Sequence, residues 1–145
     1  MDKVRGLLKA YALRDGEAAA RLSEGFTPED RREYHYLAMA LFSIVAAARL
    51  GENPSPADLD GLVEELRYDY RDLGPDQINY LHVTGALQAL YGKDYLLEDM
   101  TPDEQVKAFL PVVVKIAAQS TEVRERLDDS LDDAERLVED WKRGA

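Results

Sequence analysis

Two histidines are the side chains of this sequence best suited to acid–base or metal chemistry, and both lie in uncharged segments. A catalytic or metal-binding histidine normally has a carboxylate, a thiol or a second ligand three or four positions away on its helix. Neither His35 nor His82 has a carboxylate at those spacings. The sequence therefore favours hydrogen-bonded histidines in a helical core, because buried polar groups are normally paired.

The surroundings of the histidines also allow a second interpretation, a ligand pocket. If the two uncharged segments pack together as helices, their hydroxyl and amide side chains would face an apolar cleft, as in many small-molecule sites. The candidate pocket residues are His35, Tyr36, Asn79, His82, Thr84 and Gln88. Such a pocket would belong to a small-molecule binding protein or to an unfamiliar enzyme.

A charged and aromatic cluster in the middle of the chain is a candidate partner surface. Tyrosine and arginine are enriched in protein interfaces because both are large and amphipathic. The candidate residues are Glu64, Glu65, Arg67, Tyr68, Asp69, Arg71 and Asp72. An ordinary solvated helix face is the alternative interpretation.

The acidic residues do not predict a metal site. Carboxylate-bound di-metal bundles use Glu-x-x-His pairs on two helices, and the chain has none. The stretch Asp58-Leu59-Asp60-Gly61 resembles part of a calcium loop, but Arg67 occupies the position of the bidentate acid. A chain without cysteine forms no disulfide and no thiolate zinc site. We expect no metal and no cofactor.

Motifs for nucleotide binding, serine hydrolysis and zinc proteolysis are also absent from the sequence. The formal net charge is −11, and residues 52–104 hold 13 acidic against 3 basic side chains. Such a charge repels phosphate backbones and anionic lipid surfaces. The leading hypothesis is therefore a non-catalytic protein-interaction or regulatory module that binds a protein partner or a second copy of itself, without nucleic acid or membrane. The alternative is that the acidity serves solubility alone.

Four proline-marked signals predict where helices begin. In each, a residue able to cap a helix precedes a proline suited to the first turn. The signals are Thr27-Pro28-Glu29-Asp30, Ser55-Pro56-Ala57-Asp58, Gly74-Pro75-Asp76-Gln77 and Thr101-Pro102-Asp103-Glu104. Together with the apolar spacing they predict helices over about 2–13, 16–24, 28–50, 56–72, 75–91, 102–119 and 121–142.

The predicted fold is all-α: a single compact domain over 1–145, with six to seven helices around the two apolar helices 28–50 and 75–91. Gly85 predicts a close approach to another backbone, with Ala46–Ala48 as its expected counterpart. Pro111 predicts a kink in a core helix or a hinge. The proline-marked helix starts are spaced 47 residues (Pro28 to Pro75) and 46 residues (Pro56 to Pro102) apart, which is compatible with an internal repeat of two helices.

The two terminal helices are amphipathic. In the last one, Leu127, Leu131, Ala134, Val138 and Trp141 form an apolar seam that predicts docking on the same chain, with pairing between chains as the alternative. The first helix is basic, and we expect its apolar face to cover the core. Contact with a membrane surface is the alternative.

No feature of the first residues resembles a signal peptide, and the uncharged run 34–48 is shorter than the roughly 20 residues of a membrane span. We expect a cytoplasmic protein. Arginine outnumbers lysine, which is typical of a G+C-rich bacterial genome.

Overall fold

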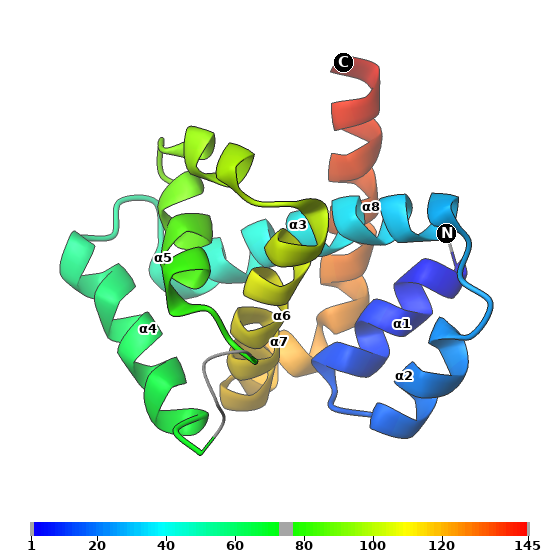
Figure 1. Cartoon of the computed structure of the whole chain (residues 1–145), viewed down its shortest axis with the longest axis horizontal. Coiled ribbons are helices and arrows are strands. Elements are labelled where there is room, and N and C mark those ends of the chain that lie inside the picture. Colours follow the sequence, from blue (N-terminus) through cyan, green and yellow to red (C-terminus); the bar gives the residue numbers. More distant parts are fainter. Residues whose placement is uncertain (1, 73–76, 145) are drawn as a thin grey trace.

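A computed structural model describes residues 2–72 and 77–144 of the chain (Figure 1). Within these ranges the chain forms helices and no strand. The helices are α1 (Asp2–Ala12), α2 (Gly16–Ser23), α3 (Pro28–Leu50), α4 (Pro56–Asp69), α5 (Tyr80–Ala89), the 3-10 helix η1 (Asp94–Asp99), α6 (Pro102–Gln119), α7 (Thr121–Glu125) and α8 (Leu127–Gly144). The predicted all-α fold is confirmed, with the last predicted helix divided into α7 and α8.

Three of the four proline-marked signals begin helices as predicted. In each, the cap hydroxyl accepts a hydrogen bond from the third helical N–H, and the carboxylate there accepts one from the cap's own N–H. These caps are Thr27, Ser55 and Thr101. The fourth predicted start, at Gly74-Pro75, falls on residues outside the described ranges. Helix α5 begins at Tyr80, and the Asn79 side chain caps it by accepting a hydrogen bond from the His82 N–H.

Helix α3 is central, as predicted, but its main neighbours are α6 and α8, whereas α5 packs on α4, α6 and η1. The rings of Phe42 and Phe109 stack at the contact between α3 and α6, with centroids 4.7 Å apart. The expected pairing of α3 with the segment 75–91 is therefore replaced by one with α6. The reason is length: α5 has 10 residues, α6 has 18 and α3 has 23, so α6 covers more of α3.

Gly85 and Pro111 lie inside helices, where both residues are unfavourable. A Cβ atom at Gly85 would lie 3.0 Å from the end of the Met100 side chain, so the glycine has a close neighbour, but it is a side chain and not the predicted backbone. Its neighbour is Met100 rather than the predicted Ala46–Ala48, because α5 packs on η1 and the turn that follows. Helix α6 continues through Pro111, and a hinge at this proline stays a prediction.

Helix α8 buries its apolar seam within the same chain. Four seam residues are buried, and α8 packs mainly on α3. They are Leu127, Leu131, Ala134 and Val138. Docking in cis is thus what the structure shows for this part of α8. The C-terminal end of the helix extends beyond the rest of the bundle (Figure 1).

The basic face of α1 lies against the acidic face of α8. The Arg5 guanidinium is 2.6 Å from the Asp132 carboxylate, and the Lys9 ammonium is 3.0 Å from that of Asp128. These ion pairs account for the basic character of α1 within the fold. Among the described residues, no helix is long and apolar enough to cross a membrane.

Candidate functional site

An open groove between α1, α3 and α6 is the cavity with the most distinctive lining. Its volume is about 610 Å³. Most of its surface is apolar, and Tyr11 and Tyr36 remain 43% and 38% exposed. The lining residues are Leu7, Tyr11, Arg31, Arg32, Tyr34, His35, Tyr36, Pro102, Asp103, Val106, Lys107 and Leu110. We call this site the α1/α3/α6 groove.

The imidazole of His35 is held in one orientation by a buried glutamine. The Gln105 amide nitrogen donates hydrogen bonds to the carbonyls of Leu97 (2.9 Å) and Met100 (3.2 Å), which fixes its oxygen on the other side. That oxygen lies 2.7 Å from His35 Nε2. Because an amide oxygen only accepts, Nε2 carries the proton, and Nδ1 of the neutral ring is an acceptor.

Tyr34 places a polar atom in apolar surroundings beside the groove. Its hydroxyl is buried and has no hydrogen-bond partner among the described residues. The ring packs edge to face on Phe26, with centroids 6.2 Å apart. Burial raises the pKa of the Tyr34 phenol above its ordinary value, with a smaller contribution from the nearby Tyr11. The hydroxyl therefore stays protonated, as a hydrogen-bond donor without an acceptor.

The charge of the groove is opposite to that of the whole chain. Three cationic side chains line it, Arg31, Arg32 and Lys107, against one carboxylate, Asp103. Within the described parts of the chain, none of the three cations has a carboxylate oxygen within 4.0 Å. The groove is thus a basic site on a protein of net charge −11.

The six residues predicted to share a pocket are distributed over two places. His35 and Tyr36 line the α1/α3/α6 groove, whereas no residue of α5 does. His82 Nε2 lies 3.9 Å from a carboxylate oxygen of Glu104 on α6. The pKa of that carboxyl is lowered chiefly by the Thr101 backbone N–H, with a smaller effect of His82. The remaining predicted residues are Asn79, which caps α5, and the half-buried Thr84 and Gln88.

The acids of the predicted partner surface are largely engaged within the chain. Lys115 of α6 is only 3% exposed, and its ammonium lies 2.5 Å from Asp69 and 3.9 Å from Glu65. Glu65 also pairs with Arg49 of α3 at 2.9 Å. These contacts tie α4 to α3 and α6. Part of the acidity read from the sequence is therefore balanced by cations of the same chain.

The two arginines of that surface each lie over a tyrosine ring. Arg67 lies over the Tyr80 ring at 4.6 Å and is 3.3 Å from the Glu64 carboxylate. Arg71 lies over the Tyr68 ring at 4.4 Å. The last predicted member, Asp72, is exposed.

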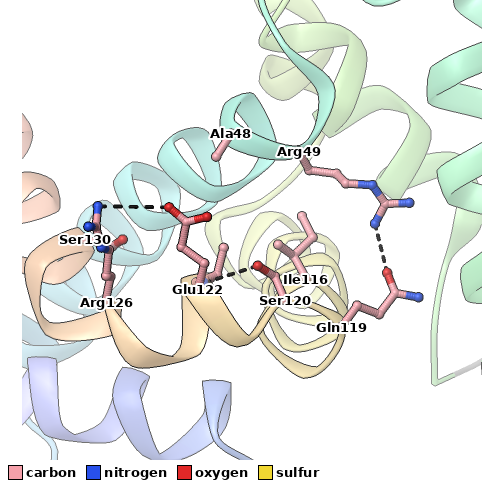
Figure 2. A pocket seen from close by; sticks show the side chains of 9 residues that line it. Ala48, Arg49, Ile116, Gln119, Ser120, Glu122, Arg126 and Ser130 are labelled. Atoms are coloured by element: carbon pink, nitrogen blue, oxygen red, sulfur yellow. Dashed lines mark hydrogen bonds and ion pairs between the residues drawn. The ribbon is translucent and has the colours of Figure 1, made fainter.

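A second cavity, of about 600 Å³, lies where α3, α6, α7 and the start of α8 meet (Figure 2). Arg49 donates a hydrogen bond to Gln119 at 2.8 Å, and Arg126 is 3.9 Å from the Glu122 carboxylate. The Ser120 hydroxyl accepts a hydrogen bond from the Val123 N–H. These polar groups are paired, which leaves the α1/α3/α6 groove as the stronger candidate. No group of three or more metal-binding side chains occurs in the described ranges.

Comparison of the chain with protein families, with curated proteins and with solved structures finds no match to any of them. Sequence reasoning named His35 and Tyr36 but missed Gln105 and Lys107, which lie some 70 positions further along the chain. It also left out Arg31 and Arg32, although both precede His35 at spacings that place them on its face of the helix.

Proposed function

We propose that the protein is a non-catalytic binding protein, and that its ligand is a small molecule with an apolar body that occupies the α1/α3/α6 groove. One observation carries the proposal: a largely apolar groove of about 610 Å³ keeps aromatic rings exposed beside the Tyr34 hydroxyl, which has no hydrogen-bond partner among the described residues. Its volume lies within the usual range of ligand sites, about 300 to 1,000 Å³. Tyr11 and Tyr36 supply rigid aromatic contacts there.

The hydrogen bonds of His35 support binding over catalysis. Its Nε2 proton is directed to Gln105, which is itself fixed by two backbone carbonyls. This arrangement holds the ring in one tautomer and fixes its orientation in the groove. The partner of Nε2 is a neutral amide, whereas the histidine of a catalytic triad has a carboxylate partner that stabilises its protonated form.

The experiment is a thermal-shift screen of metabolites on the full chain and on two variants. Val106→Trp fills the groove from α6, and Ala48→Trp places the same side chain in the second cavity as a matched control. We expect a ligand that stabilises the wild type and Ala48→Trp but not Val106→Trp. Circular dichroism checks that both variants fold, and Tyr36→Ala replaces Val106→Trp if the latter does not. Ligand protection unaffected by the groove variants would contradict the proposal.

We propose as a second function that a protein partner binds the predicted partner surface. The exposure of Tyr68 on that surface favours this proposal. This side chain is 68% exposed while Arg71 lies over its ring, a pairing of the kind enriched at interfaces. Pull-down at low salt with Tyr68→Ala tests it, with Tyr95→Ala as the control because Tyr95 is also 57% exposed. Loss of a partner in the first variant alone would support this surface. Equal capture by both variants and the wild type would count against it.

The chain's composition supports the cellular setting of either proposal. The absence of cysteine fits a reducing compartment, and we propose the cytoplasm of a bacterium with a G+C-rich genome. The net charge of −11 supports ligands other than nucleic acid and membranes. Self-association stays open and is measured by light scattering.

A further inference from the structure

The cationic side chains of the groove point to the chemistry of its ligand. The three cations and the one carboxylate of the lining sum to a charge of +2. Exposed cations on an acidic protein normally lie next to acids, as Lys9 and Arg49 do here. Arg31, Arg32 and Lys107 instead line the groove together with Asp103, and none of the three forms an ion pair with a carboxylate in the described ranges. Their charge is thus available to a ligand.

We propose that the groove binds a monocarboxylate with a hydrocarbon body, such as a medium-chain fatty acid. This inference rests on the proposed function and names the ligand of that site. The carboxylate pairs with the cations Arg31, Arg32 and Lys107, and the hydrocarbon covers apolar side chains of the same groove. Those apolar side chains are Leu7, Val106 and Leu110.

Charge complementarity is the reason for proposing an anionic ligand. A guanidinium binds a planar carboxylate through two parallel hydrogen bonds, which gives direction as well as energy. An amine would be repelled by the same three cations. A neutral alcohol of equal length would gain the apolar contacts but leave the cations unpaired, so the difference between acid and alcohol isolates the charge.

The extent of the apolar surface is the reason for proposing a ligand with a hydrocarbon body. Most of the groove surface is apolar, and three helices contribute to it. Burial of one methylene contributes about 0.8 kcal/mol, which corresponds to roughly fourfold in affinity per added carbon. A series of linear acids should therefore bind more tightly with length until the groove is filled. A small anion such as acetate should bind much more weakly.

The test is calorimetric titration of the full chain with decanoate and with decanol, each as free monomer. We expect decanoate to bind at one site at least about tenfold more tightly than decanol. The triple variant Arg31→Gln, Arg32→Gln, Lys107→Gln should lose that preference while it keeps decanol binding. Arg49→Gln with Arg126→Gln, two arginines of the second cavity, is the matched control and should behave as the wild type.

The outcomes separate this inference from the proposed function. If acid and alcohol bound with equal affinity and Val106→Trp blocked both, the inference that the ligand is a carboxylate would be overturned. The groove would still be a ligand site. No binding of either compound, together with a metabolite screen without hits, would overturn both proposals. The protein could instead sediment with phosphatidylglycerol vesicles in a way that depends on the three cations. That result would show that a membrane surface supplies the anion and would overturn the inference of a free acid as ligand. The expected result is no sedimentation.

Discussion

The imidazole of His35 and the amide of Gln105 lie 2.7 Å apart and join α3 to α6, although 70 positions separate the two residues. Gln105 is buried and makes two further hydrogen bonds, to the carbonyls of Leu97 and Met100. One side chain therefore connects α6, the end of η1 and the candidate ligand site. Its removal should affect both stability and the histidine.

We expect Gln105→Met to lower the free energy of unfolding by about 1 to 3 kcal/mol, because a similar volume remains but buried acceptors lose their donor. Urea denaturation measures this change. Gln119→Met is the control on the same helix: Gln119 is exposed, so the change should stay within about 0.5 kcal/mol. Nitrogen NMR of His35 should show the Nε2-protonated tautomer in the wild type and a mixture in the variant. A single tautomer in both proteins would contradict the role of Gln105.

The ion pair of Lys115 with Asp69 gives a second prediction. Asp69→Asn leaves a nearly buried ammonium with only the more distant Glu65 as a counter-charge, and we expect a loss of about 1 to 3 kcal/mol. Lys115→Met in addition should restore much of that loss, because the unpaired charge is gone. Denaturation of both variants measures the coupling. A double variant no more stable than Asp69→Asn alone would show that the charge is not the cause.

Local signals in the sequence predicted local structure well. The cap at Thr27 and Asp30 involves residues three positions apart, so its chemistry is visible in the sequence and the helix begins where expected. The partner of α3 was not predictable in this way, because two apolar segments compete for it and periodicity does not state which one lies closer. The choice depends on the final lengths of α5 and α6.

The candidate site shows the same limit. His35 and Tyr36 were identified because their residue types carry chemistry. The groove also needs Tyr11 from α1 and Lys107 from α6, and only the packing of three helices brings them together. The acidic cluster shows a related limit. Glu65 pairs with Arg49 and Lys115, and the sequence does not reveal these pairs because the cations are distant along the chain. The partner surface itself stays a prediction.

A third prediction concerns acid sensitivity at the contact between α1 and α3. The Asp30 carboxylate accepts hydrogen bonds from the Lys3 ammonium and from the Thr27 N–H, which lower its pKa from 3.8 to about 2. A carboxyl whose pKa is lowered by folding stabilises the fold at pH values above the pKa that it has in the unfolded chain. That contribution is lost as the pH falls from about 4 to 2. Stability measured by denaturant over this interval should fall less steeply for Asp30→Asn. Identical slopes for the variant and the wild type would contradict the assignment.

The last prediction concerns α8, whose seam residue Leu131 is fully buried within the chain. Leu131→Ala removes buried methyl groups and leaves a cavity against α3, so we expect a loss of about 2 to 5 kcal/mol in the free energy of unfolding. The exposed Leu81→Ala is the matched control and should change stability by less than about 0.5 kcal/mol. Light scattering should give the same mass for both variants as for the wild type, because the seam docks in cis. If Leu131→Ala instead lowered the mass and kept the melting temperature, the seam would stabilise an assembly of chains rather than the fold of one.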